Sequence, residues 1–433
     1  MPTIAYYTLG CKVNQYETER YRRDLEVAGF RIVPFNSQAD VYVVNTCSVT
    51  ATADSKSRAA IRRAIKSNRN ALIVVTGCYA ELEAAQLKNI SAKILTVSNS
   101  EKDALSALIS AQFDSAVETT ISELGQVSPN SPPRLRTRAI VKVQDGCDQF
   151  CSYCVIPYAR PCKPSRSFED VLSEVQDLTN HGYKEVVLTG IRLGSYGTTQ
   201  SSESSRLPEL ISLVSTINGI GRIRLSSIEP WEVSDALLEA MQSPKVCRHL
   251  HIPLQSGDDD TLLAMNRPYT AAQYIQIVDR VRRAISGIAV TTDVIVGFPG
   301  ETEQAFANTR SLVDAIGFSR LHVFRFSPRK RTSAASLPDH VSADEKKRRA
   351  EEISDLGTIT QRRFASSLIG QSLEVLVEKG GGTGHLVGFS DNYVETRFHG
   401  DLSLRGEIVR VKIEAAEHNF LIGSMEGKDE QDR

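Results

Sequence analysis

Short apolar runs alternate with amphipathic stretches over the first 113 residues. Runs rich in β-branched residues and bounded by turn residues predict buried strands, whereas apolar positions three and four apart predict helices. The predicted strands are Ile4–Thr8, Arg31–Phe35, Val41–Asn45, Leu72–Thr76 and Lys93–Val97. The predicted helices are Tyr16–Ala28, Ala51–Ser67, Glu81–Leu87 and Glu101–Gln112. This order predicts an N-terminal α/β domain, residues 1–113, with a mainly parallel sheet.

The alternation stops in residues 114–137, whose Pro, Ser and Arg content is typical of a linker, and resumes in residues 138–341. Six more strands are predicted, at Ala139–Gln144, Glu185–Thr189, Arg222–Ser227, His249–Pro253, Ala289–Val296 and Leu321–Phe326. The helices between them are Phe168–Asn180, Leu207–Ile217, Val233–Met241, Ala271–Ile285 and Glu303–Ala315. Successive βα units of this kind predict a partial (β/α)6 barrel.

The last part of the chain changes pattern again. Residues 342–368 form a charged helical stretch in which Ser342 and Glu345 have the spacing of a capping box. Residues 369–425 predict a small antiparallel β module, and residues 426–433 a polar tail. The predicted strands of the module are Ser372–Glu378, Gly384–Phe389, Asn392–Arg397 and Glu407–Ala415. The chain is therefore expected to be an α/β protein with three folded parts and a connecting helix.

Charge and composition narrow the class of protein. The 433 residues include 51 basic and 52 acidic side chains, so any nucleic-acid surface must be local. No apolar run approaches the about 18 residues of a membrane span, and the N-terminus does not resemble a signal peptide, so a cytoplasmic protein without membrane contact is expected. Eight cysteines are too sparse for a disulfide scaffold, and in a reducing compartment clustered cysteines indicate metal ligands or catalytic thiols.

One cluster, Cys147, Cys151 and Cys154, follows the first predicted barrel strand, at the edge where such barrels carry their chemistry. Structural zinc sites usually close with four ligands, whereas three thiolates on a 4Fe-4S cluster leave one iron free. The spacing therefore favours an open 4Fe-4S cluster. The alternative is a zinc loop with a distant fourth ligand, for which the candidates are Cys162, His249 and His251.

Three other cysteines, Cys11, Cys47 and Cys78, are far apart in the sequence but occupy equivalent places. Each follows a predicted strand of the N-terminal sheet, and the carboxyl ends of parallel strands are where α/β sheets bind ligands. The pattern therefore predicts a second cluster with three thiolates. The alternative is three unrelated buried cysteines, because free cysteine is among the most buried residue types.

The spacing C-x3-C-x-aromatic-C, with Tyr153 as the aromatic residue, resembles the signature of radical S-adenosylmethionine enzymes. Two open clusters in tandem, followed by a β module of the TRAM type, make residues 3–420 similar to the methylthiotransferases of that family. The opening stretch Thr8-Leu-Gly-Cys-Lys-Val-Asn-Gln-Tyr-Glu-Thr18 resembles the branch that acts on N6-threonylcarbamoyladenosine beside the tRNA anticodon. The resemblance implies insertion of sulfur and a methyl group at C2 of that adenosine by means of a 5′-deoxyadenosyl radical.

The resemblance also implies cofactors, partners and roles. Cys147, Cys151 and Cys154 would hold the radical-generating 4Fe-4S cluster, and Cys11, Cys47 and Cys78 an auxiliary 4Fe-4S cluster. The remaining partners would be S-adenosylmethionine, a flavodoxin- or ferredoxin-like electron donor and a sulfur donor. Residues expected near S-adenosylmethionine are Tyr153, Gly190, Glu229 and Gln255. Glu229 could equally cap a helix start, and Gly190 could be an ordinary glycine at a strand end.

Basic residues near the Cys147–Cys154 loop and after the last barrel strand are candidates for RNA binding, although a charge run can also be a solvated face. They are Arg134, Arg136, Arg138, Arg160, Arg329, Lys330 and Arg331. Residues 369–433 hold seven basic and twelve acidic residues, a balance that disfavours phosphate binding. Rival functions are methylthiolation of another tRNA adenosine or of a ribosomal protein side chain, and, in another class, a non-catalytic RNA-binding protein stabilised by zinc.

Overall fold

The computed structural model describes residues 1–433 except 92, 114–135, 163, 200–203, 381–383 and 427–433. Most of the predicted linker, and the predicted tail beyond residue 426, lie outside the described residues. The chain forms two compact units. Unit 1 comprises residues 1–133, 145–163 and 327–335, and unit 2 comprises residues 134–144, 164–326 and 336–433. The segment 145–163, with three cysteines, therefore belongs to unit 1, although the strands that flank it in the sequence belong to unit 2.

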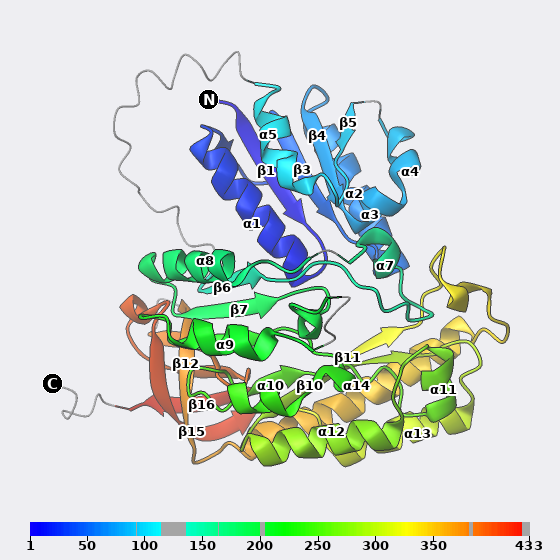
Figure 1. Ribbon diagram of the computed structural model, residues 1–433, viewed down its shortest axis with the longest axis vertical. Helices are drawn as coiled ribbons and strands as arrows, with labels where there is room; N and C mark the ends of the chain where they lie inside the picture. Colours follow the sequence, from blue (N-terminus) through cyan, green and yellow to red (C-terminus); the bar gives the residue numbers. More distant parts are fainter. Residues whose placement is uncertain (92, 114–135, 163, 200–203, 381–383, 427–433) are drawn as a thin grey trace. The chain divides into compact units, whose positions relative to one another are not determined.

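Unit 1 is built on a five-stranded parallel sheet with the order β2-β1-β3-β4-β5 (Figure 1). Its strands are β1 (Thr3–Thr8), β2 (Arg31–Ile32), β3 (Val41–Thr46), β4 (Leu72–Gly77) and β5 (Ile94–Thr96). Its helices are α1 (Lys12–Val27), α2 (Ala51–Ser67), α3 (Cys78–Leu82), α4 (Ala84–Lys88), η1 (Lys102–Ala104), α5 (Leu105–Ser110) and α7 (Ile156–Ala159). The predicted N-terminal α/β domain is confirmed, with a shorter β2 and an earlier start of α1.

Both faces of this sheet are covered. All six residues of β3 are buried, and alternate side chains enter two different cores. Tyr42 packs with Ile61 of α2, whereas Val43 packs with Leu25 of α1. Burial on both faces explains why the central strands read as continuous apolar runs and not as an alternating pattern.

The first part of unit 2 is a barrel-like array of six parallel strands. Two three-stranded sheets, β6-β7-β8 and β9-β10-β11, are joined by bridges from Ile223 to Val246 and from Ser227 to His251. The strands are β6 (Arg138–Lys142), β7 (Glu185–Thr189), β8 (Arg222–Leu225), β9 (His249–His251), β10 (Ala289–Val296) and β11 (Arg320–Arg325). The covering helices are α8 (Phe168–Asn180), α9 (Leu207–Ser215), α10 (Asp235–Ala240), α11 (Asp259–Ala264), α12 (Ala271–Ala284) and α13 (Glu303–Ile316). Short 3-10 turns lie at η2 (Leu193–Ser195) and η3 (Pro230–Glu232), whereas η4 (Ser333–Ser336) lies almost wholly in unit 1.

The long helix α14 (Ala343–Ser366) leads to the C-terminal module. The Ser342 side chain accepts a hydrogen bond from the Glu345 N–H at 3.2 Å, as the sequence spacing predicts for the start of this helix. The module is a closed barrel, β12-β13-β14-β16-β15, with a short turn η5 (Leu402–Leu404). Its strands are β12 (Ser372–Gly380), β13 (His385–Ser390), β14 (Glu395–His399), β15 (Ile408–Glu417) and β16 (Phe420–Met425). Among the described residues, every helix is too short or too polar to span a bilayer.

The fifth strand, β16, was not predicted, and it changes the module. It pairs antiparallel with β15 but parallel with β14, and this parallel pair closes the barrel. The expected antiparallel module therefore contains one parallel pair. Closure removes the free strand edges that a four-stranded sheet would expose.

Buried arginines attach this module to the barrel strands of unit 2. Arg222 and Arg224 on β8 both pair with Glu185 on β7, at 2.5 and 2.8 Å, and all three side chains are at most 2% exposed. The same guanidinium groups donate to backbone carbonyls of the module, including those of Phe389 and Ser390. Burial acts to raise the pKa of Glu185, but the two arginines outweigh it and hold that pKa at about 2.

Candidate metal centre

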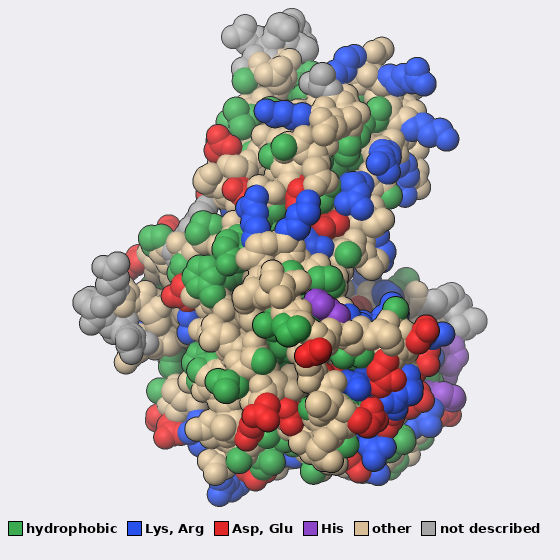
Figure 2. All heavy atoms as spheres, turned by 90° about the vertical axis from the view of Figure 1, so that its right-hand side faces the viewer, with side chains coloured by type: hydrophobic (Ala, Val, Ile, Leu, Met, Phe, Trp, Pro, Cys, Tyr) green, Lys and Arg blue, Asp and Glu red, His purple; other side chains and the backbone are tan. Residues whose placement is uncertain are grey.

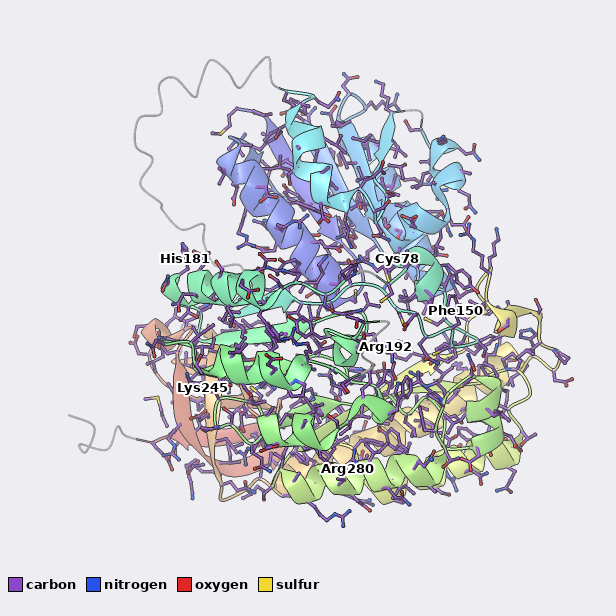
Figure 3. All side chains as sticks on the ribbon, in the orientation of Figure 1. Cys78, Phe150, His181, Arg192, Lys245 and Arg280 are labelled. Atoms are coloured by element: carbon purple, nitrogen blue, oxygen red, sulfur yellow. The ribbon has the colours of Figure 1, made fainter. Side chains whose placement is uncertain are left out.

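Three cysteines of unit 1 lie at the carboxyl ends of neighbouring strands, as the sequence predicts. Cys11 caps the start of α1 just after β1, Cys47 directly follows β3, and Cys78 begins α3 directly after β4. The strands β1, β3 and β4 are adjacent, and Thr8, Asn45 and Thr76 are paired across them in register. Cys78 is labelled in Figure 3, where β4 passes into α3. The three cysteines therefore lie at the same edge of the sheet, beyond the carboxyl ends of these strands.

The approach between these loops is close enough to require glycine. A Cβ on Gly10 would lie 2.9 Å from Cβ and 3.0 Å from Sγ of Cys47. A Cβ on Gly77 would lie 2.4 Å from the carbonyl oxygen of Thr46. Gly10 and Gly77 have φ angles of 94° and 90°, which glycine adopts without strain. These two glycines allow the cysteine loops to pack against one another.

The thiols of this trio interact electrostatically. Burial raises the pKa of Cys47, and the nearby Cys11 thiol and Asp54 act in the same direction. Burial raises the pKa of Cys78 to about 12, against the effect of the neighbouring Arg160 guanidinium. Buried thiols of raised pKa are poor thiolates on their own, whereas iron is bound by thiolates and its charge offsets their burial. The donor set and its burial therefore fit an iron–sulfur cluster.

Two asparagines and a threonine, which the sequence reasoning did not single out, hold the trio's loops. The Asn14 side chain donates to the carbonyls of Leu9, at 2.7 Å, and Thr46, at 2.9 Å. The Asn45 side chain donates to the carbonyl of Asn14 at 3.0 Å. The Thr46 hydroxyl donates to the Thr76 carbonyl and accepts from the Ala80 N–H. The local signal for these roles is nearness to a cysteine in the chain. Asn14 lies three positions after Cys11, and Asn45 and Thr46 directly precede Cys47.

The other cysteine trio lies on one compact loop of the same unit. The Cys147 N–H donates to the Arg160 carbonyl at 3.0 Å, which closes the loop. Within it, the Cys154 N–H donates to the Cys151 carbonyl at 3.0 Å. Cys151 is buried, and Cys147 and Cys154 are half-buried. Tyr153, the aromatic residue of the motif, is also half-buried in this loop.

Arg160 is a buried ion-pairing residue, so its predicted role in RNA binding is wrong. It is 2% exposed, and its two terminal nitrogens lie 2.9 Å from the two carboxylate oxygens of Glu17. It also donates to Asp145 and to the Asn14 side chain. Lys102 pairs with the same two carboxylates, so two cations face two anions. Burial acts to lower the pKa of Arg160, but Glu17, Cys78 and Asp145 outweigh it and hold that pKa well above its usual value.

Two further arginines predicted to bind RNA are engaged within the protein. Arg329 is 9% exposed, pairs with Asp54 at 2.5 Å and donates to Ser48, the residue after Cys47, at 2.7 Å. Arg138 pairs with Glu378 at 2.8 Å and lies over the rings of Phe389 and Tyr393. This internal pairing disfavours the RNA contacts predicted for these two residues, which stay predictions. Their partners are distant in the sequence, so a charge run could not reveal the pairing.

The remaining basic candidates differ in what the structure says about them. Arg136, Lys330 and Arg331 are exposed. Arg134 lies outside the described residues. Exposure leaves the first three as candidates for RNA contact.

The predicted S-adenosylmethionine residues of unit 2 follow three consecutive strands. Gly190 follows β7, and a Cβ there would lie 2.7 Å from Oε1 of Gln144, so packing alone accounts for glycine. Glu229 follows β8, caps η3 and pairs with Arg267. Gln255 follows β9, is 8% exposed and has a φ of 66°. Glu229 lies at the N-cap position of η3, where its N–H donates to the Glu232 carboxylate at 3.2 Å, and its contact with S-adenosylmethionine stays a prediction.

A further polar group, on strands β9 to β11 of unit 2, was not predicted. Asp293 Oδ1 lies 3.3 Å from Nε2 of His251 and 3.1 Å from Nδ1 of His322. Burial acts to raise the pKa of Asp293, but hydrogen bonds from the two imidazoles outweigh it and hold that pKa below its usual range. His251, one of the candidate zinc ligands, also contacts the Thr291 hydroxyl at 3.0 Å. The pairing register of β9, β10 and β11 brings these side chains together, and the sequence alone does not reveal that register.

Comparison with known proteins adds to this geometry. Three family models match in chain order: the uncharacterized protein family UPF0004 over residues 3–98, the radical SAM superfamily over 141–313 and the TRAM domain over 366–425. The threonylcarbamoyladenosine tRNA methylthiotransferase MtaB of Bacillus subtilis (strain 168) is 39% identical over 425 residues, which are 95% of this chain and 94% of the relative. The chain belongs to the radical S-adenosylmethionine methylthiotransferase family. The resemblance inferred from the cysteine motifs is confirmed.

Other members of this methylthiotransferase family align over similar lengths. MtaB of Thermotoga maritima is 36% identical over 417 residues, 95% of each chain. A tRNA-2-methylthio-N(6)-dimethylallyladenosine synthase of Alkalilimnicola ehrlichii is 34% identical over 435 residues, 98% of this chain and 97% of the relative. Among solved structures, the radical S-adenosylmethionine methyltransferase TsrM of Kitasatospora setae matches 77% of each chain with a TM-score of 0.53 and 16% identity, which supports the fold.

Membership of this methylthiotransferase family fixes the cofactor class. The enzyme uses S-adenosylmethionine and 4Fe-4S clusters. Unit 1 supplies two sets of three cysteines, and three cysteines leave one iron of each 4Fe-4S cluster without a protein thiolate. The residues present therefore fit the cofactors that the family requires.

Proposed function

We propose that this chain adds a methylthio group to C2 of N6-threonylcarbamoyladenosine beside the anticodon of tRNA. Support comes from the two MtaB relatives, at 39% and 36% identity over nearly the whole chain, against 34% for the dimethylallyladenosine synthase. The opening stretch from Thr8 to Thr18 resembles the same branch. The coarser activity, tRNA methylthiotransfer by radical chemistry, is common to both groups of relatives.

The observation that carries this proposal is the presence of two cysteine trios in one compact unit. Cys147, Cys151 and Cys154 would hold the radical-generating cluster, and Cys11, Cys47 and Cys78 the auxiliary cluster. When bound, the clusters supply the reductive cleavage of S-adenosylmethionine and a site for the inserted sulfur. Arg160 contacts both trios: its carbonyl accepts from the Cys147 N–H, and its guanidinium lies beside the Cys78 thiol.

The chain's own residues would position these ligands and exclude water from them. Asn14, Asn45 and Thr46 hold the three strand-end loops, and the buried charges around Arg160 hold the 145–160 loop against α1. Cys47 and Cys78 are 6% and 4% exposed, so solvent has little access to these two auxiliary ligands, whereas Cys11 is exposed. Protection of this kind suits a site that handles radicals, because exclusion of solvent prevents side reactions.

The cofactor residues of unit 2 remain part of the proposal. Gln255 has a left-handed backbone conformation, and its N–H donates a hydrogen bond to the Asp293 carbonyl at 2.9 Å. Together these features fix the position of the Gln255 Cβ. Glu229 is held by Arg267, which also lies over Trp231. We propose that Gly190, Glu229 and Gln255 contact S-adenosylmethionine, and the same contact stays a prediction for Tyr153 of unit 1.

The RNA substrate must present the C2 edge of its adenine, which requires the base to leave its stack. An anticodon loop permits this at low cost because its bases are not in a continuous duplex. Arg136, Lys330 and Arg331 are the exposed basic residues that we propose for RNA contact. A flavodoxin- or ferredoxin-like electron donor, a separate sulfur donor and a cytoplasmic site of action complete the proposal.

The direct test uses the anaerobically reconstituted holoenzyme and three RNA substrates. They are a tRNA carrying threonylcarbamoyladenosine, the same tRNA without that modification, and a tRNA carrying isopentenyladenosine. Mass spectrometry of the nucleosides should show the methylthio product from the first tRNA alone. Product from the third tRNA would assign the chain to the dimethylallyladenosine branch.

A second arm addresses the rivals outside tRNA. A ribosomal protein fraction is incubated with the same holoenzyme and examined for methylthio side chains. Modification there, with unchanged tRNA, would replace the substrate proposal. Zinc in place of iron in the purified protein, with no product from any substrate, would favour the non-catalytic RNA-binding protein.

A further inference from the structure

A cavity of about 260 Å³ in unit 1 is lined in part by residues that directly follow Cys78 and Cys154 in the chain. Its lining includes Arg58, Tyr79, Leu82, Val155, Lys330 and Arg331, and we call it the Arg58 pocket. The volume is near the lower end of the about 300–1,000 Å³ typical of pockets for small molecules. It therefore suits one small charged group better than a whole cofactor.

The lining carries a surplus of positive charge. Arg329 and Asp54, which also line the cavity, neutralise one another at 2.5 Å. Arg58, Lys330 and Arg331 then face a single further acid, Glu83. Within the described residues, Lys330 and Arg331 form no ion pair. Two uncompensated cations in a concave site favour an anionic ligand.

The donors around the Arg58 pocket are partly fixed in place. Arg58 donates to the Tyr79 hydroxyl at 3.4 Å and lies over the Tyr79 ring, which is fully buried. Arg331 has a left-handed backbone, with φ of 74°, and one of its guanidinium nitrogens donates to the Leu82 carbonyl at 3.2 Å. A guanidinium anchored at one nitrogen keeps other N–H groups for a ligand, and its planar fork suits phosphate oxygens.

The position of the Arg58 pocket links it to the chemistry. Tyr79 follows Cys78 in the chain, and Val155 follows Cys154. Cys78, Leu82 and Val155 pack together in one small apolar cluster. Leu82 and Val155 line the pocket and pack with Cys78, so a group bound in the pocket would lie near Cys78 of one trio and near the residue that follows Cys154 of the other. Figure 2 shows Lys and Arg side chains gathered in the upper part of the view.

We propose that the Arg58 pocket binds a backbone phosphate of the RNA substrate, close to the adenosine that is modified. The inference rests on the proposed function and adds an anchoring site to it. Contacts to phosphates fix the register and orientation of a nucleic acid, and base contacts supply its sequence specificity. A phosphate held in this pocket would determine which nucleotide of the anticodon loop reaches the reaction site. This effect would not depend on the modification that the target adenosine carries.

The test compares two double variants that remove equal charge from unit 1. Lys330→Ala with Arg331→Ala removes two pocket cations. Arg62→Ala with Lys66→Ala removes two exposed cations of α2 that do not line the pocket. Each reconstituted holoenzyme is titrated with the tRNA at several KCl concentrations, and iron content and thermal midpoint report whether the variants are folded and loaded.

The pocket variant should bind the tRNA at least about 10-fold more weakly, the low end of the cost of losing a hydrogen bond to a charged group. Its slope of log affinity against log salt should fall by about 0.7 for each phosphate that the variant no longer neutralises. The α2 variant should change both quantities much less. Equal losses of affinity in the two variants, or unchanged affinity in the pocket variant, would overturn the proposal.

Two further measurements identify the source of the phosphate and distinguish failure of this proposal from failure of the proposed function. Adenosine monophosphate and inorganic phosphate are added as competitors, and neither should displace the tRNA at micromolar concentration; displacement there would identify a free-nucleotide or phosphate site. Pocket-dependent binding of tRNA without any methylthio product would leave the anchoring site standing and remove the proposed function. Product formation that is equally efficient, with the same KM, in the pocket variant would remove the anchoring site alone.

Discussion

The guanidinium of Arg160 and the carboxylate of Glu17 form a two-pronged ion pair, 2.9 Å on each side, with both side chains at most 2% exposed. Glu17 lies on α1, the helix that begins after Cys11, and Arg160 closes the loop that carries Cys147. The pair therefore joins the elements that carry the two cysteine trios. Lys102 and Asp145 add one further cation and one further anion, so the four buried groups carry no net charge.

Replacing Arg160 with methionine should destabilise unit 1 strongly. The substitution keeps much of the buried volume but leaves Glu17 and Asp145 short of a cation, and breaking a buried ion pair from one side costs about 3–5 kcal/mol. Denaturant unfolding of the variant and the wild type measures the difference. Arg206→Ala is the matched control, since its pair with Glu209 is half-exposed and should be worth under about 1 kcal/mol. A loss of stability at Arg160 no larger than that at Arg206 would contradict the network.

Replacing Asn14 with alanine should weaken the auxiliary site selectively. The side chain donates to two carbonyls in the loops of Cys11 and Cys47, and buried carbonyls left without partners cost about 1–3 kcal/mol each. Iron per chain after anaerobic reconstitution should fall from about eight toward about four, while the radical cluster remains detectable by electron paramagnetic resonance. Asn180→Ala, at the exposed end of α8, should leave the iron content unchanged. Equal iron in the Asn14 variant and the wild type would show that the loops do not need this residue.

Stability should depend on pH through Glu232. Burial raises the pKa of this carboxyl to about 7, with Glu229 adding to the rise and Arg192 opposing it. The folded state therefore holds a proton more tightly than the unfolded chain, so the free energy of unfolding falls as pH rises from about 4.5 to about 7, by about 3 kcal/mol in full. Glu232→Gln should remove this decline, whereas Glu209→Gln should retain it. Parallel curves for the Glu232 variant and the wild type between pH 5 and 7.5 would refute the assignment.

The sequence was most informative where chemistry follows strand ends. Cys11, Cys47 and Cys78 could be grouped from sequence because each follows an apolar run, and parallel strands bring their carboxyl ends to one edge. The ion pairs of Arg160 and Arg329 could not be predicted, because their partners, Glu17 and Asp54, lie 143 and 275 residues away in the chain. A run of basic residues therefore predicts exposed side chains, whether or not those side chains are buried in the fold.

The same reasoning explains two structural differences. The closure of the C-terminal module by parallel pairing of β16 with β14 could not be predicted, because pairing between strands that are not consecutive leaves no local signal. The loop 145–163 was expected to belong with the barrel because it follows β6 in the sequence. Its place in unit 1 depends on contacts such as that between the Asn99 side chain and the Ala159 carbonyl, 60 residues apart.

The central claim is that two separate cysteine trios each bind a 4Fe-4S cluster, and iron analysis of matched triple variants tests it most directly. The variant Cys11→Ala, Cys47→Ala, Cys78→Ala should keep about four irons per chain and reductive cleavage of S-adenosylmethionine, but form no methylthio product. The variant Cys147→Ala, Cys151→Ala, Cys154→Ala should keep about four irons and lose that cleavage. Loss of all iron in either variant, or about eight irons in both, would contradict the claim.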